Sequence, residues 1–293
     1  MDLSLIADAV VLGVLTGAVY ALMASGLTLI FGVMDIINIG QGALVILGAY
    51  LSYALSRYWH IDLFLGLLIT MPMMFALGVL IELVFIRPLK RDRTMFSILV
   101  TFGIAIVIEG LLGLIFSTDL VKLDAWYVTQ SFSIFGFYIA YIYLFGFILS
   151  LLLLGGLYLL LYRTQFGAGL RASMQNRVAA QLIGIDVERV SALTFGIGVA
   201  LTAAGGMVFG ATNSFNPGSH YDLISRLLVI IVLGGMGSLG GALIASFAML
   251  VVEDVTAALW SPTWSTTVFF ILLVLVLLVR PQGLFGQLAG RKQ

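Results

Sequence analysis

Cysteine is absent from this chain of 293 residues, and charge is scarce. Without cysteine there is no disulfide, zinc–thiolate cluster or thiol nucleophile. Charged residues make up 10% of the chain, against about 25% in soluble proteins. In contrast, 61% of the residues are hydrophobic and the mean hydropathy is +1.16. A bilayer solvates such a composition and water does not. We therefore predict an all-α integral membrane protein with one transmembrane domain spanning residues 1–293.

Groups for nucleic-acid binding, ATP binding and catalysis are also missing. The 14 basic and 14 acidic residues balance, so no basic surface is expected for nucleic acid. None of the three lysines follows a glycine, which excludes a Walker A loop. Residues 235–240 match G-x-G-x-x-G, but they lie between apolar segments rather than in a soluble βαβ unit. His60 and His220 are expected in external loops. With no buried histidine expected, a membrane enzyme is disfavoured, and no cofactor or metal is predicted.

Long apolar segments dominate what is present. A membrane-spanning helix needs about 20 mostly apolar residues. Eight segments qualify as candidates, at residues 9–33, 41–56, 63–86, 95–116, 134–162, 190–211, 241–258 and 265–280. No positively charged region precedes the first, so we expect it to remain as a span rather than act as a cleaved signal. Residues 223–234 form a shorter apolar piece.

Basic residues predict the orientation, because they favour the cytoplasmic side. Eleven of the 14 lie in three places, which are Arg87, Lys90, Arg91 and Arg93, then Arg163, Arg171, Arg177 and Arg189, then Arg280, Arg291 and Lys292. If all three are cytoplasmic, the N-terminus is outside, the C-terminus is inside, and residues 223–234 count as a ninth crossing. If that piece is re-entrant, there are eight spans and the basic C-terminus breaks the rule.

Two glycine-rich breaks resemble each other and indicate a weak internal repeat. The first reads Gly40-Gln41-Gly42-Ala43-Leu44 and the second reads Gly240-Gly241-Ala242-Leu243-Ile244. The candidate path includes Asn38, Gly40, Gln41 and Gly42 at the first break, and Gly235 and Gly237 just before the second. Transporters built from repeats place broken helices beside the substrate path. Glycines equally allow two helices to pack closely. The sequence leaves both interpretations open.

Two acidic residues, Glu109 and Glu253, lie well inside predicted spans. Such carboxylates are costly in a membrane and usually face protein or a wet cavity. We therefore place both on the candidate path, with hydrogen bonding to neighbouring helices as the alternative.

The stretch 164–189 combines helical composition with charge. Leu170, Met174, Val178 and Leu182 recur every four residues and predict one amphipathic cytoplasmic helix, with Gly184 as its C-cap. Such a helix docks on the membrane surface or in the groove of a partner. The alternative is that the four arginines of this stretch only mark the cytoplasmic side of the membrane.

This stretch resembles the coupling loop of bacterial ABC importer permeases, and more narrowly the H-type permease of branched-chain amino acid importers. The matching positions are Thr164, Phe166, Gly167, Leu170, Arg171, Ala172, Asn176, Ala179, Ala180, Gly184 and Ile185. Residues 25–44, 232–246 and 280–286 also resemble the family, in the family's order. Residues 117–137 do not allow a comparison.

The resemblance implies a permease subunit in a bacterial inner membrane that moves branched-chain or other hydrophobic amino acids. It implies two ABC ATPase subunits that bind the ATP, a second related permease, and an extracytoplasmic solute-binding protein. It further implies that Arg171 and Asn176 contact an ATPase, with Thr164, Gly167, Ala172, Ala179 and Gly184 in the same coupling loop. Two alternatives stay open. Permeases of urea and short-amide importers look similar, and a self-sufficient secondary transporter or channel would use Glu109 and Glu253.

Overall fold

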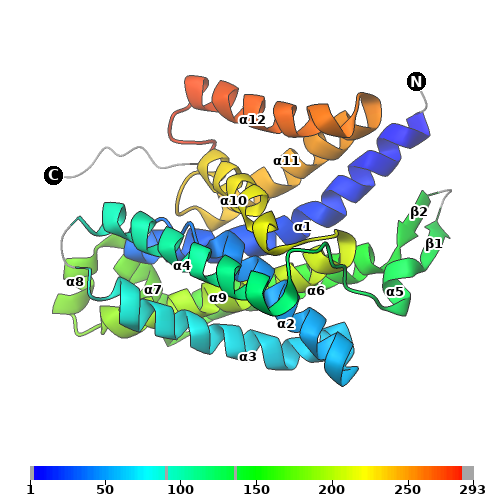
Figure 1. Cartoon of the computed structure of the whole chain (residues 1–293). Coiled ribbons are helices and arrows are strands. Elements are labelled where there is room, and N and C mark those ends of the chain that lie inside the picture. Colours follow the sequence, from blue (N-terminus) through cyan, green and yellow to red (C-terminus); the bar gives the residue numbers. More distant parts are fainter. Residues whose placement is uncertain (1–2, 90–91, 135–136, 286–293) are drawn as a thin grey trace.

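The computed structural model describes residues 3–89, 92–134 and 137–285, and Figure 1 shows that they form a bundle of long helices. The elements in chain order are α1 (Leu3–Met34), α2 (Gln41–Trp59), α3 (Leu63–Ile81), the π-helical turn η1 (Glu82–Ile86), α4 (Arg93–Phe116), α5 (Trp126–Thr129), β1 (Ser131–Ile134), β2 (Phe137–Ala140), α6 (Tyr141–Arg163), α7 (Gln165–Gln175), α8 (Arg177–Leu182), α9 (Val187–Thr212), the 3₁₀ turn η2 (Pro217–Ser219), α10 (His220–Gly234), α11 (Leu239–Leu259) and α12 (Pro262–Val279). The predicted all-α membrane class is confirmed.

Seven of the described helices are long and apolar enough to cross a membrane, namely α1, α3 with η1, α4, α6, α9, α11 and α12. Two others fall short. Helix α10 has 15 residues, and α2 has 19 but carries Gln41, Arg57 and several tyrosines and serines. Because α2 lies among other helices rather than against lipid, its polar side chains need not face hydrocarbon. The count of eight or nine spans stays a prediction.

The predicted span 134–162 begins too early. Residues 131–134 and 137–140 pair as antiparallel strands, with Ser131 opposite Ala140, and α6 starts only at Tyr141. Serine alternates with apolar and aromatic residues here, a period of two that suits a strand better than a helix. The apolar content of the hairpin mimics a membrane span when only hydropathy is counted.

Helix α9 is the central element of the bundle, and glycines of three other helices let them come close to it. A Cβ added at Gly26 of α1 would lie 2.5 Å from the carbonyl oxygen of Gly198. One added at Gly48 of α2 would lie 2.8 Å from Cα of Ala203, and one at Gly78 of α3 2.9 Å from Cα of Gly196. Small residues at helix contacts are typical of membrane bundles, where close packing drives association.

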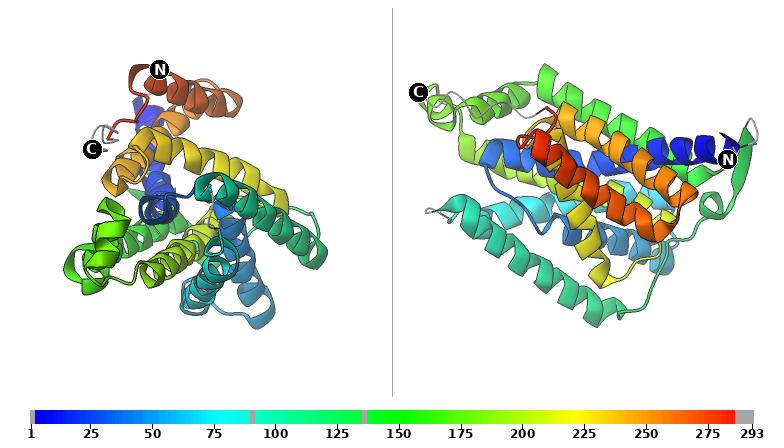
Figure 2. Two further views of the ribbon diagram at one scale, coloured as in Figure 1. Left: turned by 90° about the vertical axis from the view of Figure 1, so that its left-hand side faces the viewer. Right: turned by 90° about the horizontal axis from the view of Figure 1, so that it is seen from above.

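The basic loops meet at one end of the bundle. Arg87, after α3, forms an ion pair with Glu188 at the start of α9. Met174 of α7 lies against Gly32 near the end of α1. The backbone N–H of Leu284 donates to the Leu233 carbonyl of α10 at 2.7 Å, which brings the segment after α12 to the same region. In Figures 1 and 2 the N-terminus lies at the opposite end. Lys90, Arg91, Arg291 and Lys292 lie outside the described residues.

Candidate functional site

The stretch 164–189 folds as two helices, so the predicted single amphipathic helix is wrong. Asn176 is extended, with φ −156°, and separates α7 from α8. Its Oδ1 accepts a hydrogen bond from the Ala179 N–H at 3.0 Å, which caps α8. Thr164 caps α7 in the same way through the Gly167 N–H at 3.1 Å. Asparagine and threonine favour caps over helix interiors, because their side chains bind the free N–H groups of the first turn.

The predicted apolar stripe is divided by this break. Leu170 is buried and Met174 lies against Gly32, so α7 is docked on the protein's own bundle. On α8 and just after it, Val178 is 65% exposed, Leu182 83% and Ile183 74%. The three exposed side chains form an apolar surface, here called the α8 surface, at the end of the bundle that carries the basic loops.

Arg171 and the glycines of this stretch have intramolecular roles. The Arg171 guanidinium donates to the Leu161 carbonyl and lies 5.1 Å from the centre of the Tyr162 ring. Gly167 packs against the last carbonyls of α6, where a Cβ would clash. Gly184 has φ +88° and directly follows Ile183, the C-cap of α8, so a glycine marks the helix end as predicted, one residue beyond the cap itself. A contact of Arg171, Ala172, Asn176 or Ala179 with another subunit stays a prediction.

The first glycine-rich break is deep in the protein. Asn38 and Gln41 are both fully buried, and Asn38 Nδ2 donates to Gln41 Oε1 at 3.0 Å. A Cβ at Gly40 would lie 2.9 Å from the Thr101 carbonyl oxygen, and one at Gly42 would lie 2.5 Å from that of His220. These glycines therefore allow α4 and α10 to approach the start of α2. None of the four residues lines the cavities described below.

Just before the second break, glycine is used for a different reason. Gly235 and Gly237 have φ +91° and +84°, which side chains rarely adopt. They reverse the chain between α10 and α11, and Ser238 then caps α11 by accepting from the Gly241 N–H at 3.1 Å. The two breaks resemble each other in sequence, but the glycines of the first allow close packing, whereas Gly235 and Gly237, just before the second, form a turn.

Glu109 has two partners that bring α4 and α10 together. Its Oε2 lies 3.1 Å from Nε2 of His220 and accepts from the Tyr221 hydroxyl at 3.0 Å. The expectation that His220 lies in an external loop is wrong, since it begins α10 and is 2% exposed. The segment before it folds inward, with Phe215 paired to Val121. Asn216-Pro217-Gly218 is a common turn sequence and forms the start of η2, but hydropathy does not show whether such a turn is buried.

Glu253 belongs to a second charged group, which the sequence analysis missed. The Arg226 guanidinium contacts Glu253 of α11 and, through Nε, Asp222 at 2.9 Å. Arg226 is the one basic residue between Arg189 and Arg280. Its spacing of four residues from Asp222 on an otherwise apolar helix was the available signal. A carboxylate and a guanidinium on facing helices satisfy each other away from lipid.

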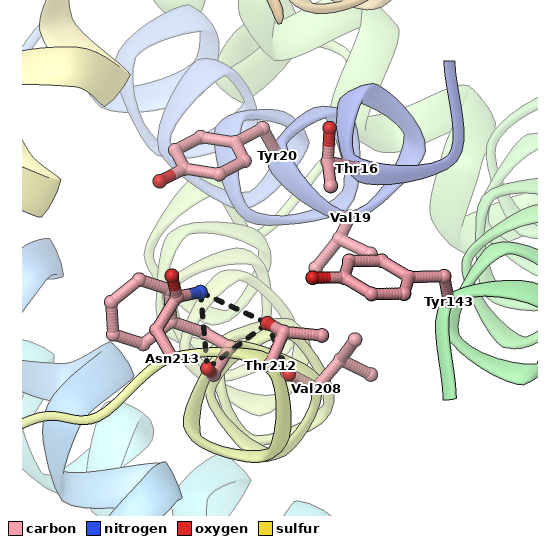
Figure 3. A pocket seen from close by; sticks show the side chains of 8 residues that line it. Thr16, Val19, Tyr20, Tyr143, Val208, Thr212 and Asn213 are labelled. Atoms are coloured by element: carbon pink, nitrogen blue, oxygen red, sulfur yellow. Dashed lines mark hydrogen bonds between the residues drawn. The ribbon is translucent and has the colours of Figure 1, made fainter. Parts of the chain in front are cut away.

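Two cavities lie near the helices that carry these groups, and Glu109 lines the larger one. A small one of about 30 Å³ lies between α1, α6 and α9, with Tyr20, Tyr143, Thr212 and Asn213 around it. Figure 3 shows these polar side chains, and Asn213 donates to the Thr212 hydroxyl at 2.9 Å. This volume suits a water molecule or two. A larger cavity of about 420 Å³ is lined by Ile106, Glu109, Gly110, Gly113, Thr118, Asn216, Pro217 and Gly218.

Comparison with known proteins identifies the family. Residues 9–277 match the family model described as branched-chain amino acid transport system, permease component. The chain is 30% identical over 292 residues to the high-affinity branched-chain amino acid transport system permease protein LivH of Escherichia coli K12, covering 94% of each protein. It is 28% identical over 297 residues to BraD, the permease of the same description in Pseudomonas aeruginosa, again covering 94% of each.

A third relative is more distant. The permease protein LivM of Escherichia coli K12, named for the same transport system, is 25% identical over 296 residues, covering 91% of this chain and 67% of that protein. No solved structure matches. Because the family model spans nearly the whole bundle, from α1 to α12, the chain belongs to the family of permease components of branched-chain amino acid transport systems.

Proposed function

We propose that this chain is a permease subunit of an ATP-driven importer that moves branched-chain or other hydrophobic amino acids across the inner membrane. Its partners in this proposal are two ABC ATPases, which bind the ATP, a second related permease, and an extracytoplasmic solute-binding protein. Family membership favours this function over a urea or short-amide permease, and over a self-sufficient transporter. Similarity to both LivH and LivM of one organism supports a related chain as the second permease.

The α8 surface is the observation that carries the proposal. Helix α7 is fixed to the bundle by Leu170 and Met174, and α8 follows after the single residue Asn176, with its Ala180 buried. An apolar surface on a short helix attached in this way fits the groove of a partner and can transmit its movement. In this proposal the ATPase contact is formed by Val178, Leu182 and Ile183. Arg171 supports it from within, by binding the last turn of α6.

The proposal includes an orientation, with the N-terminus outside and the C-terminus in the cytoplasm. The meeting of the three basic regions at one end supports it, because basic residues favour the cytoplasmic side. The candidate path runs past Glu109 and Glu253, with the two glycine-rich breaks as the structural frame around it. Rocking of one permease against the other would open it alternately to each side.

Replacing Val178 and Leu182 with serine tests the coupling role. We expect the complex to hydrolyse ATP with at least about tenfold weaker stimulation by the loaded binding protein, since truncating an interface hot spot costs about 2 kcal/mol or more and a tenfold change corresponds to about 1.4 kcal/mol. The matched control is Leu152→Ser, an exposed apolar residue of the membrane-spanning α6. The measurement is ATPase activity in proteoliposomes. Full stimulation of the α8 variant would contradict the proposed contact.

A further inference from the structure

The 420 Å³ cavity beside α4 holds a carboxylate with an unused oxygen. Glu109 lies inside the membrane-spanning α4 and is 30% exposed, on the wall of this cavity. Its Oε2 takes both hydrogen bonds, from His220 and Tyr221. Its Oε1 makes no hydrogen bond to any described residue and lies 3.8 Å from where a Cβ of Gly218 would be. One oxygen is therefore fixed and the other is available to a ligand.

Two other carboxylates in the spans have an arginine partner: Glu82 lies 3.9 Å from Arg93, and Glu253 contacts Arg226. Asp254 of α11 accepts instead from the Thr16 hydroxyl at 3.4 Å. The ionisable group that faces Glu109 is the buried His220, with the Tyr221 hydroxyl beside it. A carboxylate in apolar surroundings binds a cation strongly, because little water competes. The cavity lacks that cation among its lining residues.

The remaining walls suit a small apolar group. Ile106 and Pro217 supply apolar surface, and Gly110 and Gly113 leave space, since a Cβ at either would meet nothing within 4 Å. Sites for small molecules typically have volumes of about 300–1,000 Å³, with mostly apolar walls and a few polar groups that fix orientation. The ammonium group and the branched apolar side chain of a free amino acid match this carboxylate and apolar space, and Thr118 and Asn216 are the uncharged polar residues of the lining.

We propose that this cavity is a binding site for the ammonium group of an amino acid in transit, with Glu109 Oε1 as its acceptor. This inference rests on the proposed function. His220 and Tyr221 are positioning residues, because they bind the other oxygen and fix the direction of the carboxylate. The apolar side chain of the cargo lies toward Ile106 and the open faces of Gly110 and Gly113.

Glu109→Gln tests the site in the complete complex, with both permeases, the ATPases and the binding protein in proteoliposomes. Loss of one charged hydrogen bond predicts a fall of roughly ten- to a hundredfold in ATP-dependent uptake of radiolabelled leucine. Asp8→Asn, which removes an exposed carboxylate near the start of α1, is the matched control and keeps full uptake. Gly110→Leu leaves Glu109 in place but fills the cavity, and also lowers uptake.

A second measurement tests whether Glu109 binds the ammonium group of the cargo or pairs instead with a cationic residue of the partner permease. The detergent-solubilised complex without binding protein is titrated with 3-methylbutylamine and with 4-methylpentanoate. We expect the amine to bind, the acid not to bind, and Glu109→Gln to abolish amine binding. Loss of the second permease on purification of Glu109→Gln would overturn the inference, because the cation would then belong to the partner. Equal leucine uptake by Glu109→Gln and wild type would also overturn it. If the wild-type complex itself takes up no amino acid, the proposed function fails instead.

Discussion

Arg226 shows how single residues hold this bundle together. It is 16% exposed and contacts Glu253, which is 9% exposed, across the α10–α11 contact. Burying both ions costs hydration, and their mutual attraction offsets that cost only while both are present. The pair therefore fixes which faces of α10 and α11 meet, more than it adds to overall stability.

A single and a double substitution distinguish the role of the ion pair in fixing the contacting faces from its net contribution to stability. Arg226→Leu leaves Glu253 buried without a cation and is expected to lower stability by about 3–5 kcal/mol. Arg226→Leu combined with Glu253→Leu removes both charges and is expected to recover most of that loss. Thermal unfolding in detergent, followed by the fluorescence of the four tryptophans, measures both. A double variant as unstable as the single one would contradict this account.

Glycines in this chain differ in what surrounds them. A Cβ on Gly206 of α9 would clash with the Val45 carbonyl of α2, whereas one on Gly155 of α6 would meet nothing within 4 Å. We expect Gly206→Ala to destabilise the protein by about 1–3 kcal/mol through overpacking. Gly155→Ala should be neutral or stabilise it by up to about 1 kcal/mol, since alanine favours helix. The apparent Tm of each variant tests this, and equal shifts would count against close packing at α9.

At the scale of elements, the segment between α4 and α6 is attached to α3 through Asp62. Asp62 caps α3 by accepting from the Phe64 N–H at 2.9 Å, and its other oxygen accepts from the Tyr127 hydroxyl of α5 at 2.9 Å. Burial first, and then the hydrogen bond to Asp62, raise the pKa of Tyr127 well above its usual value. One carboxylate thus fixes both a helix start and the position of α5.

This contact predicts a loss of stability at high pH. Because the folded-state pKa of Tyr127 lies above the unfolded value of about 10, its contribution is complete below pH 10 and is lost as the pH rises beyond that. Tyr127→Phe lacks the contribution at every pH and should lose less stability between pH 9 and pH 11. Unfolding in detergent across this range is the measurement. Parallel curves for the two proteins would show that Tyr127 does not titrate differently on folding.

At the scale of the whole molecule, the absence of cysteine makes the proposed orientation easy to test. Asp119 lies in the exposed turn after α4, and Gln181 lies on the exposed face of α8, at the opposite end of the bundle. In intact cells with a permeable outer membrane, a membrane-impermeant maleimide should label Asp119→Cys and spare Gln181→Cys. Labelling of Gln181→Cys should need a permeabilised inner membrane. The reverse pattern would invert the orientation.

The sequence determined the class of this protein through composition, because a chain this apolar cannot be solvated outside a bilayer. It also determined the helix ends marked by Gly184 and by Gly235 and Gly237, since backbone conformation there depends on local residues. The motifs around Arg171 identified the family correctly. These features depend on residues close together in the chain, so the pattern of the sequence is enough to predict them.

Only the tertiary structure decided which residues meet. The burial of His220, its contact with Glu109, and the Arg226–Glu253 pair join helices far apart in the chain, so no spacing in the sequence reveals them. The same holds for Val178 and Leu182, which continue the helical stripe of Leu170 and Met174 and yet stay exposed. The break at Asn176 turns α8 away from the bundle, and whether an apolar side chain is buried depends on what packs against it rather than on its own chemistry.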